Sequence, residues 1–202
     1  MWPWGHAATG YLCYSLGTRL FGRTPTGSAT LAVLFGTQLP DLLDKPLSWV
    51  FELFPQGYSV GHSVFVAVPV GLFVLLAAYY SSHTETAVGF VVGYWSHLFG
   101  DLVFGLVTNN PLTSERLLWP IATLPSYTSD LSAIERILAY GISFLHFFAD
   151  EGLVPALVLL AIYFGPVVVA TLVWLYDGHP GPGTIRRMLA HSWTTAKGIL
   201  TP

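Results

Sequence analysis

Charged residues are scarce in this chain. Only 9% of its 202 residues are charged, whereas 53% are hydrophobic and 15% are aromatic. Soluble domains carry about 25% charged residues, so a soluble protein of this size could not cover its surface with so few. The composition predicts an all-α membrane protein, a polytopic bundle of about six helices, some of them short.

Cysteine and basic residues are also rare. Cys13 is the only cysteine, which excludes an internal disulfide and a cysteine-based zinc site. The formal net charge is −3, with 8 lysine and arginine residues in all, so the chain lacks the basic surface that nucleic acids require. We therefore expect no nucleic-acid partner.

Apolar segments divide the chain into predicted membrane spans. The clearest are residues 63–80, 86–105 and 153–176, and weaker ones cover 7–22, 28–43 and 132–149. Pro40 is expected to end the second segment. We assign residues 1–178 to a membrane-embedded domain and residues 179–202 to a short basic tail. Alternating spans would then leave both termini on one side.

Basic residues are unevenly shared between the two faces of this arrangement. One face receives Lys45, Arg116, Arg186, Arg187 and Lys197. The other receives Arg19 and Arg23. By the positive-inside rule, the first face and both termini are expected in the cytoplasm, in a cell (inner or plasma) membrane. The basic tail would lie on lipid head groups.

Ionisable side chains interrupt the apolar segments near that same face. They are His6, Asp41, His62, His97 and Asp101. An ionisable group inside a span usually faces a protein interior, a cavity or a metal. Imidazole and carboxylate are ligands that divalent metals take. The pattern predicts a site for one or two divalent ions, zinc first, with manganese as the alternative.

Other interpretations of these residues remain open. His97 and Asp101 are four apart on one helix face, but so are His146 and Asp150, and a buried His–Asp hydrogen bond could simply stabilise the bundle. Asp41 and Asp44 also suit a solvated turn beside Lys45, or Asp44 could orient a histidine. His146, Asp150 and Glu151 fall on the opposite face and are left outside the site.

The order of these motifs resembles the YdjM-type family, membrane-bound proteins to which metal-dependent hydrolysis is ascribed. The resemblance rests on Gly5-His6, Leu39-Pro-Asp41-Leu-Leu-Asp44, Gly61-His62-Ser63, Gly93 to Asp101, and Leu118-Trp119-Pro120. It covers residues 5–120. The family often shows His-Arg-Gly-x-x-His-Ser, of which this chain keeps only the final histidine, His62.

The ligand order is also similar to that of zinc-dependent phospholipases C and single-strand-specific zinc nucleases, which are all-helical enzymes that cleave phosphoesters. That resemblance implies one zinc held by Asp41, His62, His97 and Asp101. It implies a second zinc held by His6 and Asp101, with Asp101 bridging. The later His-x3-Glu of those enzymes is not evident here.

Together these features predict an enzyme, a membrane-bound metal-dependent hydrolase with a phospholipase-like action. It would cleave a phosphoester of a lipid-linked substrate with a metal-activated water, and membrane lipid would be its partner. Asp41 or Asp44 would accept the water proton, and Arg116 would hold a phosphate oxygen. The alternatives are a transporter for a metal ion or proton, or a structural membrane protein without catalysis.

Overall fold

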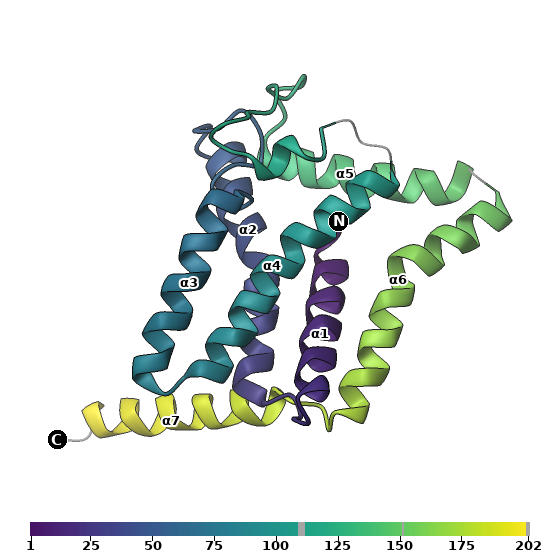
Figure 1. The fold of residues 1–202 in the computed structure, drawn as a ribbon. Helices are drawn as coiled ribbons and strands as arrows, with labels where there is room; N and C mark the ends of the chain where they lie inside the picture. The colour runs from purple at the N-terminus through teal and green to yellow at the C-terminus, as the bar shows by residue number, and fades with distance from the viewer. Residues whose placement is uncertain (109–111, 151, 201–202) are drawn as a thin grey trace.

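The structure is a computed structural model that describes residues 1–108, 112–150 and 152–200. In order, its helices are α1 (Pro3–Leu20), α2 (Gly27–Trp49), α3 (Val64–Ser81), α4 (Thr84–Val107), the short 3-10 helix η1 (Glu115–Leu117), α5 (Ala133–Asp150), α6 (Leu153–Tyr176) and α7 (Pro182–Leu200) (Figure 1). The described part holds no strand, which confirms the all-α prediction.

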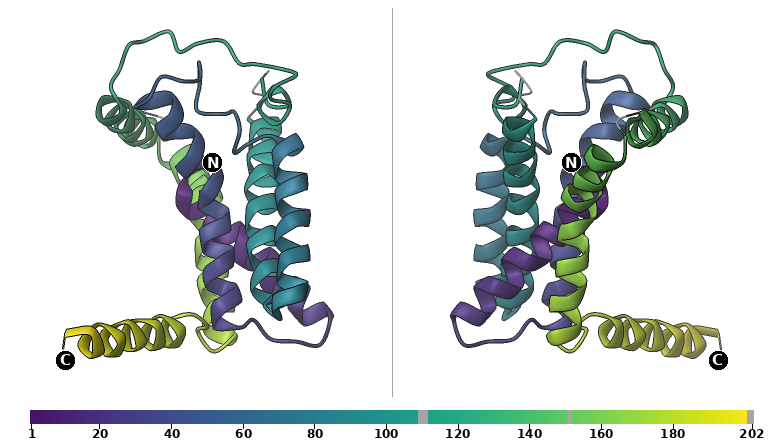
Figure 2. Two further views of the ribbon diagram at one scale, coloured as in Figure 1. Left: turned by 90° about the vertical axis from the view of Figure 1, so that its left-hand side faces the viewer. Right: turned by 90° about the vertical axis from the view of Figure 1, so that its right-hand side faces the viewer.

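Two directions of helix make up the architecture. Helices α1, α2, α3, α4 and α6 run alongside one another between two ends of a bundle, while α5 and α7 lie across opposite ends (Figures 1 and 2). By length and composition, α3, α4 and α6 are apolar enough to cross a membrane. Residues 132–149 do not form the crossing expected from sequence. Polar Glu135 and Arg136 begin α5, and an amphipathic helix is suited to the interface instead.

The position of α7 shows that the predicted distribution of basic residues between the two membrane faces is wrong. A Cβ added at Gly27, the first residue of α2, would contact Thr184 of α7, so α7 starts beside the beginning of α2. Asp41 lies 14 residues further along α2, roughly 20 Å away. Arg186, Arg187 and Lys197 therefore lie at the end opposite Asp41. The amino group of Met1, by contrast, lies beside Asp101, so the chain start and α7 are at opposite ends and not on one side as predicted. Both predictions fail because they counted α5 as a crossing.

Close packing of α2 against α4 holds the centre of the bundle. A Cβ on Gly36 would meet the backbone of Phe90, and one on Gly93 would meet the backbone of Val33. Small residues let helix backbones approach in this way within membranes. Because Gly93 is one turn before His97, this contact also sets the depth of that imidazole against α2.

Helix α2 continues through Pro40 and Pro46 to Trp49, so Pro40 does not end it as expected. A proline removes one hydrogen bond, but membrane helices tolerate this when neighbouring groups pack around the break. Here the backbone of Gly61 lies against Pro40, where an added Cβ would come within 2.8 Å of the Pro40 carbonyl oxygen. The loop that carries His62 is thereby brought onto α2.

Candidate metal centre

The structure brings the predicted ligand residues together at one end of the bundle. They are His6 on α1, Asp41 on α2, His62 in the loop before α3, and His97 and Asp101 on α4. His62 and His97 have no exposed surface, and His6 is 1% exposed. Burial of this many ionisable groups is costly unless they are paired or coordinate a metal.

Two imidazoles in this cluster have their tautomers fixed by their surroundings. Nδ1 of His97 donates to the carbonyl oxygen of Thr37 at 2.6 Å, and Nδ1 of His62 donates to Asp44 at 2.8 Å. In neutral imidazoles this leaves an unprotonated Nε2 on each ring. The two Nε2 atoms lie 3.1 Å apart. Two lone pairs at that distance repel, so the geometry requires a cation or a proton beside them.

Carboxylate oxygens complete a four-donor set around this point. Oδ1 of Asp41 lies 3.6 Å from Nε2 of His62 and 4.0 Å from Nε2 of His97. Oδ2 of Asp101 lies 3.7 and 3.8 Å from the same two atoms. Ligands of a tetrahedral zinc ion lie about 3.3 Å apart, given bonds of about 2.0–2.1 Å. The donors thus fit a small divalent ion in both type and spacing.

His6 extends the cluster on one side. Its ring stacks on that of His97 with centroids 3.7 Å apart, and neither of its ring nitrogens has a hydrogen-bond partner. Nε2 of His6 is 3.3 Å from Oδ1 of Asp101. The described residues form two overlapping groups that can bind a metal ion: His6, Asp41 and His97, and His62, His97 and Asp101. His97 belongs to both.

Asp44 holds the His62 loop in place. Its buried carboxylate accepts hydrogen bonds from the backbone N–H groups of Ser59, Gly61 and His62, and from Nδ1 of His62. These bonds fix the imidazole, as a carboxylate behind a metal-bound histidine usually does. The geometry favours an orienting role for Asp44.

A family match agrees with this arrangement. The model of the YdjM inner membrane protein family matches residues 1–176. The chain belongs to this family. No curated protein and no solved structure matches it. YdjM similarity thus extends beyond the predicted 5–120 to the end of α6, and the matched region contains every residue of the metal centre but not α7.

Charged and aromatic side chains surround the metal-binding cluster, together with the amino group of Met1. The amino group of Met1 lies 2.5 Å from Asp101, and Nζ of Lys45 lies 2.5 Å from Asp41. The guanidinium of Arg116 lies 4.4 Å above the ring of Tyr58, whose centroid is 4.7 Å from that of His62. The ring of Tyr58 therefore lies between Arg116 and His62 of the cluster.

Sequence reasoning missed two of these contributions. The Thr37 carbonyl left no signal, because a backbone acceptor depends on helix packing and not on residue type. Tyr58 lies four residues before His62 in the sequence, but nothing there indicated its contact with Arg116. The prediction that His146 falls on the face opposite the site is wrong: His146 lies on α5, which crosses the bundle at the end that carries the cluster, because residues 132–149 do not form a crossing. The side chain of Asp150 and all of Glu151 lie outside the described residues.

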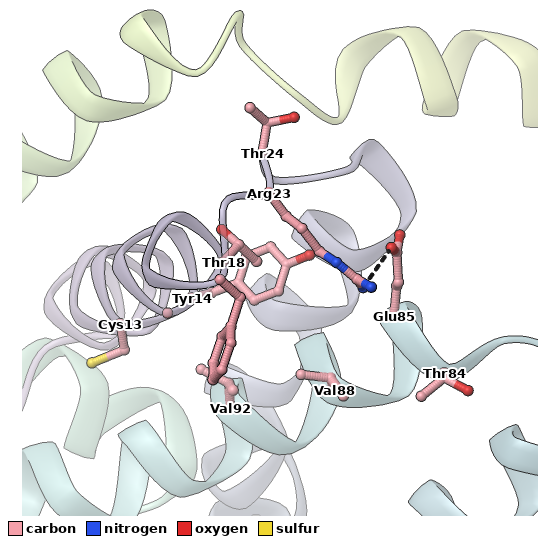
Figure 3. A pocket seen from close by; sticks show the side chains of 11 residues that line it. Cys13, Tyr14, Thr18, Arg23, Thr24, Thr84, Glu85, Val88 and Val92 are labelled. Atoms are coloured by element: carbon pink, nitrogen blue, oxygen red, sulfur yellow. Dashed lines mark hydrogen bonds and ion pairs between the residues drawn. The ribbon is translucent and has the colours of Figure 1, made fainter.

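The opposite end of the bundle has a different polar cluster. Asp177, just after α6, accepts hydrogen bonds from the hydroxyls of Tyr11 and Ser15 and from the guanidinium of Arg19. Beside it, a largely apolar groove of about 590 Å³ runs between α1 and α4. Figure 3 shows Arg23 and Glu85 pointing toward each other across this groove, 3.4 Å apart.

Proposed function

We propose that this YdjM-family protein is a membrane-bound metal-dependent hydrolase that cleaves a phosphoester of a lipid-linked substrate. The observation that carries the proposal is the pair of buried Nε2 lone pairs, 3.1 Å apart and flanked by Asp41 and Asp101. That donor set suits zinc first and manganese second. Two lone pairs held this close repel each other and so do not stabilise the fold by themselves. A bound ligand therefore explains the cluster better than helix packing does.

A divalent ion in such a site lowers the pKa of water and polarises a phosphoryl oxygen. Of the two carboxylates on α2, Asp44 has its oxygens occupied by N–H donors, whereas the side chain of Asp41 is 12% exposed. We therefore assign Asp41 to accept the proton of the attacking water and Asp44 to orient His62.

Arg116 is assigned to hold the phosphate. Its guanidinium is kept in place by the Tyr58 ring, and Nε of Arg116 has no hydrogen-bond partner. A planar guanidinium matches phosphate geometry through two parallel hydrogen bonds. Stacking of Arg116 on Tyr58 thus leaves donors available for an oxygen of the substrate.

A lipid-linked substrate is favoured by the location of the site. The cluster lies near the end of the apolar helix α4, so it is close to the depth at which lipid head groups meet the hydrocarbon. A polar cavity of about 530 Å³ lies one turn beyond Asp44 on α2, lined in part by Ser48, Trp49, Tyr127 and Arg136. This cavity has room for a polar head group at the same end of α2 as Asp41 and Asp44.

Transport is less well supported. A path through the bilayer would have to pass between α2 and α4 below His97. There Gly93 and Val33, and Gly36 and Phe90, bring the two backbones into direct contact. Tight backbone packing suits a pocket that opens at one end only.

The experiment is hydrolysis of a panel of lipid phosphoesters by purified protein loaded with zinc or manganese. We expect product with at least one of them, none from His97→Ala, and a lower rate from Arg116→Gln that Arg116→Lys only partly restores. Arg23→Gln, at the far end, is the matched control. Stoichiometric metal without any phosphoester cleavage would overturn the hydrolase assignment while leaving the metal centre intact.

A further inference from the structure

Helix α7 has one apolar face that is exposed. Ile185, Met188 and Leu189 are 45%, 61% and 67% exposed, and their spacing places them on one side of the helix. Trp193 continues the same face one turn later, where an aromatic ring suits a membrane interface. Apolar side chains with this spacing and exposure need a covering environment.

The other side of α7 is basic and polar. By helical geometry Arg187 lies opposite the apolar face and Arg186 lies beside its edge. A helix with an apolar stripe and arginines on its polar face is typical of one that lies in the plane of an anionic lipid surface.

Helix α7 lies at the end of the bundle, at the level expected for a membrane surface. It begins a few residues after the apolar helix α6 ends, and both views show it lying across the bundle and projecting beyond it (Figures 1 and 2). Its beginning rests on α2, where a Cβ added at Gly27 would meet Thr184. The projecting part therefore runs across the direction of α6, as a helix in the plane of a membrane surface would.

We propose that α7 binds the anionic lipid surface of the cytoplasmic leaflet, which places the metal centre on the external face of the membrane. Basic residues at the α7 end are Arg19, Arg23, Arg186, Arg187 and Lys197. Those at the metal end are Lys45, Arg116 and Arg136. With α7 placed by the structure, the positive-inside rule favours a cytoplasmic α7 end. This replaces the orientation expected from sequence.

A lipid surface explains both faces of α7 at once. A second copy of the chain would cover the apolar stripe but would leave Arg186 and Arg187 without a counter-charge. Anionic head groups supply that charge, and each basic side chain near them strengthens binding several-fold. The proposal does not depend on the chemistry of the metal centre, so failure of hydrolysis would leave it standing.

Labelling of single cysteines tests the orientation. In a Cys13→Ser background, Gly183→Cys marks α7 and Ser126→Cys marks the metal end, and both positions are exposed. We expect an impermeant maleimide to label Ser126→Cys in intact spheroplasts and Gly183→Cys only in inverted vesicles. The reverse pattern, or labelling of both from the same side, would overturn the proposal.

Reconstitution tests the lipid contact. Leu189→Cys, in the same background, carries an environment-sensitive dye in vesicles of phosphatidylcholine alone or mixed equally with phosphatidylglycerol. We expect a blue-shifted emission with phosphatidylglycerol that is lost in Arg186→Gln/Arg187→Gln and kept in Arg23→Gln. Equal emission in both lipids, or cross-linking of Leu189→Cys between two copies regardless of lipid, would overturn the contact.

Discussion

Asp177 and Asp101 are buried carboxylates at opposite ends of the same bundle. Asp177 accepts hydrogen bonds from three protein donors: the hydroxyls of Tyr11 and Ser15, and the guanidinium of Arg19. Asp101 has a donor too, the amino group of Met1, and Nε2 of His6 lies 3.3 Å away. Its other side faces the Nε2 atoms of His62 and His97, which present lone pairs.

The difference separates a structural cluster from a binding site. A carboxylate surrounded by donors stabilises the fold as it stands, because each polar group is satisfied. Asp101 has one donor of this kind, the amino group of Met1, but the two Nε2 lone pairs beside it repel each other unless a proton or a metal ion lies between them. The Asp177 end is therefore satisfied by protein donors, whereas the His62–His97 pair at the other end forms groups that can bind a metal ion.

The largest expected change in stability comes from Asp177→Ala. It leaves Arg19 and two hydroxyls without their acceptor, and we expect a loss of about 3 kcal/mol in the free energy of unfolding. Metal content should not change, since the site is at the other end. Denaturation in detergent, with metal analysis of the folded protein, checks both. A variant that keeps its stability but loses metal would erase the distinction between the ends.

Asp44→Asn, unlike Asp177→Ala, should mainly change metal binding. An amide can still accept some of the loop hydrogen bonds, but it orients His62 less firmly, so we expect metal affinity to fall about 10–100-fold. Competition with a metal-binding dye measures this change. Unchanged affinity would show that the carboxylate holds only the loop and not the imidazole.

Replacing His97 should cost the metal-free protein little. His97→Gln removes one of two repelling lone pairs, so we expect the metal-free form to change by at most about 1 kcal/mol. The stabilisation that added metal gives the native protein should disappear in this variant. Thermal unfolding with and without zinc provides both values. A large loss in the metal-free form would instead mark His97 as part of the structural framework.

A smaller effect is expected from acid. Burial raises the pKa of Asp177, but hydrogen bonds from Ser15, Tyr11 and Arg19 outweigh it and keep the pKa below its ordinary value. The ionised group therefore contributes stability above a pH of about 4, and this contribution is lost as the pH falls through the lower folded-state pKa. The loss should be weaker in Asp177→Asn. An equal slope in both proteins would assign the acid sensitivity to other groups.

Sequence patterns predicted which ionisable residues gather in one cluster better than they predicted the membrane arrangement. His97 and Asp101 share a helix, so their proximity follows from helix geometry, and His6, Asp41 and His62 followed from alternating spans that hold through α4. The wrong assignment is that of residues 132–149 to a membrane span. Their hydropathy resembles that of a span, but the charged residues Glu135 and Arg136 at the start of α5 favour a position at the interface. A single miscounted crossing moved Arg186 and Arg187 to the wrong end.

Tertiary contacts account for what could not be predicted. Continuation of α2 past Pro40 depends on Gly61 packing against it. The hydrogen bond that fixes His97 comes from the Thr37 carbonyl, which the sequence does not distinguish from any other. Such contacts join segments that are far apart in the chain, so local sequence patterns do not predict them.

The most direct test of the metal centre is elemental mass spectrometry of the purified protein beside His97→Ala, with Arg23→Gln as the matched control. We predict one or two zinc or manganese ions per chain in the native protein and in the control, and none in His97→Ala. No bound metal in the native protein, even after incubation with zinc or manganese and gentle desalting, would contradict the account.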